Sequence, residues 1–158
     1  MVRTLSEIQS RRLLQHSTVG RLGCVVDGEP YVVPINFVIE GDCIYSHSLP
    51  GQKIEALRKN PRSCLQVDTI SGPLHWSSVI AYGDFEEITD GVRRHEVIAK
   101  ILARYPMLTP VESTIATDGS PNQVIVFQIN IDKLTGVCEG EDSDFEMLEH
   151  LGSRTDEF

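Results

Sequence analysis

The chain has 158 residues, a length typical of one domain, and its 41% hydrophobic and 23% charged residues exclude a globally disordered protein. Residues 139–158 hold eight of its 23 acidic residues and one of its 14 basic residues, so −7 of the net charge of −9 lies at that end and the rest of the chain is nearly neutral. No basic face favours nucleic acid. Because no apolar run reaches the ~18 residues of a membrane span and the N-terminus lacks the apolar core of a secretory signal, we expect a cytoplasmic protein without membrane partners.

The N-terminal residues predict a helix that ends near residues 16–17. Thr4 and Glu7 are spaced as in a capping box, with Thr4 as the N-cap. Apolar residues follow at roughly helical spacing, at Leu5, Ile8 and Leu13.

Three strands of an antiparallel meander are predicted next, over residues 21–26, 31–39 and 43–47. Asp27-Gly28 between the first two is a strong hairpin signal. Pro34 has no N–H to donate to a ladder, so it marks an edge strand or a bulge.

The rest of the chain alternates between two helices and three strands. We expect a loop over 48–52, a helix over 53–60, strands over 63–68 and 77–88, a helix capped by Thr89 or Asp90 and ended by Pro106, a loop over 107–122, and a strand over 123–131. These turns are too short for parallel crossovers, so the pattern favours a mainly β fold, a six-stranded antiparallel barrel with short helices outside.

The pattern indicates one folded domain over residues 1–138 and an acidic tail over 139–158. A tail of this charge is typically solvated. An alternative is a short docking helix, because Phe145, Leu148 and Leu151 would form one apolar stripe.

No self-sufficient catalytic or metal-binding set is evident. Glu86 and Glu87 are adjacent in a predicted strand, so their side chains point to opposite faces. The cysteines lack metal-ligand spacing and are expected to be small buried side chains without disulfides: Cys24, Cys43, Cys64 and Cys138.

The segment Tyr45–Lys53 predicts a phosphate-binding loop, since it runs from a strand through a loop to a helix start. A helix N-terminus has free N–H groups and a partial positive charge that favour an anion. Gly51 would permit close approach of a ligand to the backbone. Hydroxyl, imidazole, amide and ammonium groups converge on this end, from Ser46, His47, Ser48, Gln52 and Lys53.

Lys53 is the most informative of these residues. A cation in the first turn of a helix opposes the macrodipole by up to ~1 kcal/mol, and a bound anion would remove this conflict. The alternative interpretation is a solvent-exposed lysine on a connecting loop.

A second polar segment opens the strand predicted over 77–88. Ser77 and Ser78 bring two hydroxyls there, and in a small barrel this strand would lie beside the loop. Trp76, the single tryptophan, would either cover a ring system or belong to the core.

Five segments in this order resemble the pyridoxamine 5′-phosphate oxidase-like FMN-binding split-barrel superfamily, most of all its nitroimidazole-resistance (Nim-like) branch. The resemblance covers roughly residues 4–135. The segments are Gly20-Arg21-Leu22-Gly23, Tyr31 to Phe37, Ile44 to Ser48 with Gly51-Gln52-Lys53, Asn60-Pro61-Arg62, and Ser78 to Gly83.

The resemblance implies a six-stranded split barrel of Greek-key type that forms a homodimer with FMN at the interface. It implies that Ser46, His47, Lys53 and Ser78 hold the phosphate and ribityl end. The strand Pro34-Ile35-Asn36 would lie along the flavin ring, and His47 would sit near the flavin as a catalytic residue. Together with the residue reasoning above, the predicted cofactor site comprises Pro34, Ile35, Asn36, Tyr45, Ser46, His47, Ser48, Gln52, Lys53, Trp76 and Ser78, without a metal. The basic residues that would bind pyridoxal phosphate in the family's oxidases have no counterpart in these segments.

The expected function is an FMN-dependent oxidoreductase. Electrons would pass from a reduced nicotinamide or similar donor through FMN to a small acceptor such as a nitroaromatic, a quinone or oxygen. His47 would donate a proton or act only as a phosphate ligand. The alternatives are a flavin-binding or flavin-storing module without turnover, and a related barrel that binds deazaflavin or haem.

Overall fold

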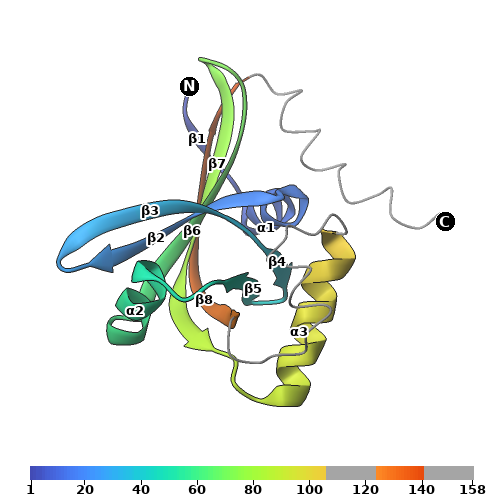
Figure 1. Cartoon of the computed structure of the whole chain (residues 1–158). Helices are drawn as coiled ribbons and strands as arrows, with labels where there is room; N and C mark the ends of the chain where they lie inside the picture. Colours follow the sequence, from blue (N-terminus) through green and yellow to red (C-terminus); the bar gives the residue numbers. More distant parts are fainter. Residues whose placement is uncertain (106–123, 141–158) are drawn as a thin grey trace.

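The computed structural model describes residues 1–105 and 124–140, which form one antiparallel sheet with three helices around it (Figure 1). The eight strands are β1 (Arg3–Thr4), β2 (Val19–Val26), β3 (Glu29–Asn36), β4 (Val38–Glu40), β5 (Cys43–Ser48), β6 (Arg62–Gly72), β7 (His75–Glu87) and β8 (Ile125–Glu139). The helices are α1 (Glu7–His16), α2 (Gln52–Lys59) and α3 (Gly91–Arg104).

The strands are hydrogen-bonded in the order β3-β2-β6-β7-β8-β5-β4, and β1 pairs with β8. Within the described ranges no ladder joins β3 to β4, the two ends of this order, so the sheet stays open there. This arrangement confirms the predicted mainly β split barrel with peripheral helices. The strand count differs from the expected six because β1 and β4 are additional short strands.

Phe37 explains why the expected strand over 31–39 is divided into β3 and β4. Its side chain is fully buried. Its backbone N–H donates to the hydroxyl of Tyr105 over 3.3 Å, and that hydroxyl donates to the Phe37 carbonyl over 2.6 Å. Tyr105 therefore replaces a neighbouring strand as the partner of this backbone, and the chain bends.

The cap of α1 differs from the prediction. Ser6 is the N-cap, and it forms a capping box with Gln9 in which each side chain bonds the other's backbone N–H. Thr4 instead pairs with Val137 in the β1–β8 ladder. A tertiary strand pairing thus moves the helix start two residues beyond the sequence signal.

Other boundaries agree with the sequence more closely. Asp27 and Gly28 both have positive φ, as the hairpin signal predicts. Asp90 caps α3 by accepting from the Arg93 N–H. β3 is at one end of the strand order, so Pro34 lies on an edge strand as expected.

The last strand is longer than predicted, since β8 continues past Ile131 to Glu139. Its register with β7 shifts around Asp132, and the ladder then resumes as far as the pair of Trp76 and Glu139. The sequence pattern did not predict this continuation, because the residues directly after Ile131 are polar. The Pro106 end of α3, the loop over 107–122 and the apolar stripe of the tail lie outside the described residues.

The core lies between the sheet and the helices. Its main cluster includes Leu14 of α1, Leu22 of β2, Leu57 of α2 and Phe127 of β8. A smaller cluster under α3 contains Tyr45, Val97 and Ile101. All four cysteines are free thiols, two of them buried and two half-buried. No helix in the described part is long and apolar enough to cross a membrane.

Candidate functional site

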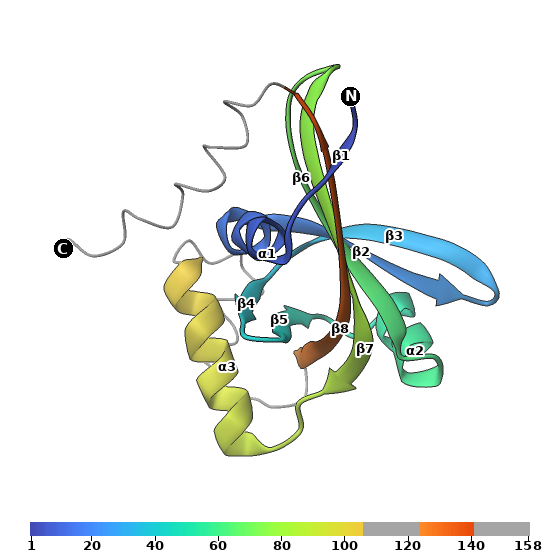
Figure 2. The same ribbon diagram turned by 180° about the vertical axis from the view of Figure 1, so that it is seen from behind.

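A cavity of about 500 Å³ lies where edge strand β3 meets the loop between β5 and α2. Figures 1 and 2 show this loop running from the end of β5 to α2 alongside the β2–β3 hairpin. The lining residues are Tyr31, Pro34, Ile35, Asn36, His47, Ser48, Leu49, Pro50, Gly51, Gln52 and Lys53. Two segments far apart in sequence thus form one site.

β3 presents both of its faces to this cavity. Tyr31 and Ile35 point toward the core side of the sheet, whereas Pro34 and Asn36 are exposed on the outer side. This is possible because β3 pairs only with β2 among the described strands. The free edge of such a strand offers backbone N–H and C=O groups to a ligand.

Ser46 fixes the two walls of the cavity relative to each other. Its hydroxyl is buried and donates to the Asn36 carbonyl over 2.7 Å. The neighbouring Ser48 hydroxyl donates to the Leu49 carbonyl over 2.8 Å and shapes the start of the loop.

The N-terminus of α2 opens into the cavity. Gly51 is its N-cap and provides no side-chain hydrogen bond, so the first N–H groups lack the usual cap acceptor. Gly51 has φ of 176°, which any residue adopts, and a Cβ there would meet only the Leu49 carbonyl oxygen, at 4.0 Å. Packing within the chain therefore does not require a glycine, and the backbone stays open to a ligand.

Lys53 is a half-buried cation on the wall of this cavity. Its pKa is lowered from the ordinary value, chiefly because burial disfavours the charged form, with a smaller opposing effect of Cys24. No carboxylate of the described residues lies within ion-pairing distance of it. A bound phosphate would supply the missing counter-charge, so the residues present fit the phosphate end of a flavin.

His47 also lines the cavity. It is half-buried on β5, opposite Val126 of β8, and its Nδ1 atom is buried. The imidazole is thus held on the same wall as the loop that carries Lys53.

The structure brings together seven of the predicted site residues: Pro34, Ile35, Asn36, His47, Ser48, Gln52 and Lys53. Ser46 is behind the wall. Tyr45 faces α3, and the Arg93 guanidinium lies over its ring. The pKa of Tyr45 is raised, chiefly by burial.

Trp76 and Ser78 do not line the cavity of their own chain, contrary to the expectation that the start of their strand lies beside the loop. Ser78 is on the outer face of β7 and accepts a hydrogen bond from Gln66. Gln66 also donates to Asp68, and Arg21 donates to both of these residues. The sheet order separates this network from the loop.

Sequence reasoning missed Tyr31 as a site residue. Tyr31 lies four residues before Ile35 in the same strand, and both line the cavity. Strand residues two or four apart share a face, so the alternation around Ile35 contained the signal.

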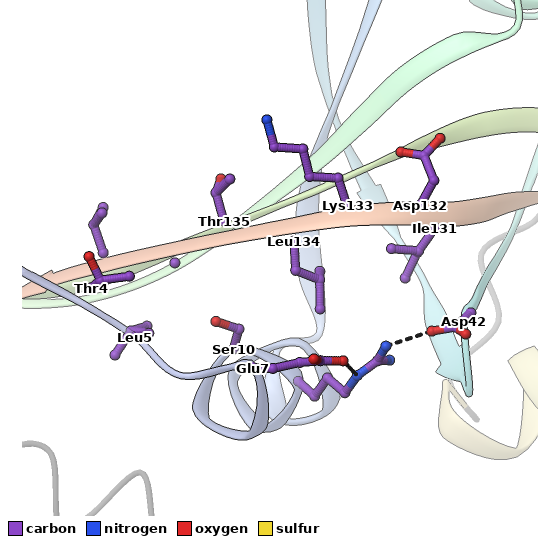
Figure 3. A pocket seen from close by; sticks show the side chains of 13 residues that line it. Thr4, Leu5, Glu7, Ser10, Asp42, Ile131, Asp132, Lys133, Leu134 and Thr135 are labelled. Carbon is purple, nitrogen blue, oxygen red and sulfur yellow. Dashed lines mark hydrogen bonds and ion pairs between the residues drawn. The ribbon is translucent and has the colours of Figure 1, made fainter.

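A larger cavity of about 620 Å³ lies between α1 and β8 (Figure 3). Arg11, one of the two cations that line it, donates to Glu7 over 3.1 Å, to Asp42 over 2.5 Å and to the Gly41 carbonyl. A Cβ at Gly136 would overlap the Ser10 hydroxyl of α1 and lie 2.9 Å from the Cβ of Leu5, which precedes that helix. The charge of Arg11 is matched by carboxylates, and the Lys133 side chain points away from α1 (Figure 3), with its ammonium 5.3 Å from the centroid of the Tyr82 ring. The cavity beside Lys53 is therefore the better candidate for an anionic ligand.

Comparison with known proteins gives consistent results. Residues 6–137 match the family model described as pyridoxamine 5′-phosphate oxidase. An uncharacterized protein of Rhizobium meliloti (strain 1021) is 31% identical over 151 residues, which cover 89% of this chain and 98% of the relative.

Solved structures share the fold. An FAD-binding protein from Mesorhizobium loti is 32% identical, with a TM-score of 0.70 and coverage of 89% of this chain and 98% of that one. A candidate 5-nitroimidazole antibiotic resistance protein from Bacteroides thetaiotaomicron is 24% identical, with a TM-score of 0.71 and 87% coverage of both chains. At that lower identity the likeness concerns the fold alone.

Proposed function

We propose that the cavity beside Lys53 binds a flavin, with FMN as the smallest sufficient ligand, because the chain belongs to the pyridoxamine 5′-phosphate oxidase family. The observation that carries this proposal is the half-buried Lys53 ammonium, which has no carboxylate partner among the described residues and stands at an uncapped helix start. The FAD-binding relative from Mesorhizobium loti supports it.

In this proposal the phosphate lies against Lys53, Gln52 and the first N–H groups of α2. Anions are favoured at such a terminus, and a lysine ammonium acts there as a point charge. The flavin ring lies along the free edge of β3 at Pro34, Ile35 and Asn36, where backbone groups are accessible.

A bound flavin would supply hydride and electron transfer between a reduced nicotinamide or similar donor and a small acceptor such as a nitroaromatic, a quinone or oxygen. The chain itself would bind, orient and shield the reacting groups. His47, on the cavity wall, would donate a proton to the product, since an imidazole titrates near neutral pH. The alternative role of His47 is a hydrogen bond to the phosphate.

A homodimer is part of the proposal. The outer face of β2, β3, β6 and β7 carries an apolar hollow of about 310 Å³ beside Val25 and Val32, which are 41% and 65% exposed. Exposed apolar sheet faces of this kind are typical of protein interfaces. A second copy on this face would also explain why Trp76 and Ser78 are remote from the cavity of their own chain, because they would complete the partner's cavity.

The reducing cytoplasm is the compartment that we propose, because the four cysteines are free thiols. A module that stores flavin without turnover is the second candidate function. It is favoured by the lack of a catalytic set beyond His47 among the residues that line the cavity.

The visible spectrum of the purified protein tests the proposal. A flavin double band supports it, whereas a Soret band would indicate haem, and a colourless protein that takes up no added FMN would reject it. Oxidation of a reduced nicotinamide in the presence of a nitroaromatic would then distinguish an oxidoreductase from a flavin store.

A further inference from the structure

We propose that a groove next to the flavin cavity binds an adenosine group, and that this group is the adenosine half of FAD. The inference rests on the proposed flavin site. The groove has a volume of about 440 Å³ and lies between α2 and the tip of the β2–β3 hairpin. Figure 1 shows α2 beside this hairpin, whose tip extends beyond the rest of the sheet.

The groove continues from the flavin cavity at Gln52, which lines both. It then follows one face of α2, because Gln52, Glu55, Ala56 and Lys59 are spaced at helical intervals and all line it. A ligand whose phosphate is held at Lys53 would enter this groove with the group attached to that phosphate. Eight residues of helix span about 12 Å, which gives room for a nucleoside beyond the phosphates.

Asp27 supplies the group that recognises a ribose. Its side chain is exposed at the end of the groove, and within the described chain it forms no ion pair or hydrogen bond. A carboxylate accepts hydrogen bonds from ribose hydroxyls, as in dinucleotide-binding folds. The hairpin turn, in which Asp27 has a φ of 50°, places this residue at the end of the groove.

Asn60 supplies a second polar contact. Its Oδ1 accepts a hydrogen bond from the Arg62 N–H over 3.3 Å, which leaves the two Nδ2 donors for acceptors on an adenine ring. The floor of the groove is apolar, formed by Val26 of β2 and Ala56 of α2, whereas the adjacent Val25 points to the outer face of the sheet. Apolar walls with a few polar groups are typical of small-molecule sites.

The charges of the groove fit a neutral nucleoside rather than a further phosphate. Glu55 and Asp27 would repel an anion in its middle and at its tip. Glu55 pairs with Arg58 at 2.7 Å, and Lys59 adds one positive charge near the end of α2. The phosphates therefore stay at the Lys53 end, and the uncharged adenosine extends toward Asp27.

Adenosine could also come from a separate nucleotide, such as a reduced nicotinamide dinucleotide. Continuity of the groove with the cavity through Gln52 favours FAD, in which both halves belong to one molecule. The two sources predict different results when FMN and AMP are offered separately.

The test compares the dissociation constants of FMN and FAD for the full chain, by quenching of flavin fluorescence. Loss of a hydrogen bond to a charged group corresponds to about tenfold in affinity, so we expect FAD to bind about ten times more tightly than FMN. D27N should remove most of this advantage and leave FMN affinity unchanged, since Asn retains the shape and tolerates positive φ. E29Q is the control, because Glu29 is an exposed carboxylate of the same hairpin outside the groove.

Equal affinities for FMN and FAD, or equal losses of both in D27N, would overturn the adenosine site and leave the flavin site standing. Binding of neither flavin would reject both proposals. A third outcome is that AMP binds to the FMN-loaded protein, that this binding depends on Asp27, and that FAD binds no more tightly than FMN. This outcome would overturn FAD as the source of the adenosine.

Discussion

Ser46 and Asn36 join the two halves of the candidate site through a single half-buried hydrogen bond. The Ser46 hydroxyl of β5 donates to the main-chain carbonyl of Asn36 at the end of β3, over 2.7 Å. Ser46 is only 1% exposed, so its hydroxyl is shielded from water, whereas Asn36 lies at the exposed edge of the sheet. The distance between the edge strand and the phosphate loop is thereby set by one short side chain.

We expect S46A to lower the free energy of unfolding by about 1 kcal/mol, because the half-buried hydrogen bond to the Asn36 carbonyl is lost. Urea unfolding followed by circular dichroism measures this change. S71A is the matched control, since the exposed Ser71 hydroxyl also donates to a main-chain carbonyl, that of His75 at 3.2 Å. An S46A loss no larger than that of S71A would show that the bond does not hold the two walls.

Gly83 is required by the packing of β7 against β8. A Cβ at this position would overlap the Asn130 carbonyl oxygen and lie 2.7 Å from its carbon. We therefore expect G83A to cost at least about 2 kcal/mol of unfolding free energy. G91A provides the comparison, because a Cβ at the start of α3 has nothing within 4 Å. Equal melting temperatures for the two variants would contradict this account of the β7–β8 pairing.

The charge of Lys53 makes flavin affinity depend on pH. Its pKa in the free protein lies below the ordinary 10.5 because of burial, and a bound phosphate would raise it. Affinity for FMN should therefore be constant at neutral pH and fall as the pH rises through the free-state pKa, before 10.5 is reached. K53R, which stays protonated, should retain its affinity over that range. Fluorescence titrations at a series of pH values measure this, and the same decline in both proteins would exclude Lys53 as its origin.

Val32 tests the proposed dimer. It is 65% exposed on the outer face of β3, and a carboxylate there would be buried unpaired at an interface. We expect V32E to sediment as a monomer and to bind FMN more weakly than the unmodified chain. V92E should remain dimeric, because Val92 lies on α3, away from this face, and is 71% exposed. A V32E dimer of unchanged affinity would count against an interface on these strands.

The sheet could be predicted from the sequence because its signals are local. Alternation of apolar residues and the Asp27-Gly28 turn define β2 and β3, and Pro34 identifies β3 as an edge strand. The cap of α1 could not be chosen this way, because Thr4 with Glu7 and Ser6 with Gln9 have the same spacing. The pairing of β1 with β8, 133 residues later at Thr4 and Val137, selects between them.

The candidate site was predictable to the same degree. The phosphate loop is contiguous in sequence, so its residues come together whatever the rest of the chain does. The Ser46–Asn36 bond depends on how β3 and β5 approach each other, which no local pattern encodes. Tyr31, by contrast, could have been found from the strand face that it shares with Ile35. Ser78 and Trp76 depend on the sheet order, and that order places them on the outer face instead of at the loop.

FMN affinity of the unmodified chain, K53E and K59E tests the central proposal most directly. Both substitutions change the net charge of α2 equally, but Lys53 lines the cavity and Lys59 does not. We predict that the unmodified chain and K59E bind FMN with similar affinity. K53E should bind at least about 100-fold more weakly, because a half-buried carboxylate would face the phosphate. Equal binding by K53E, or no binding by the unmodified chain, would contradict a phosphate site at Lys53.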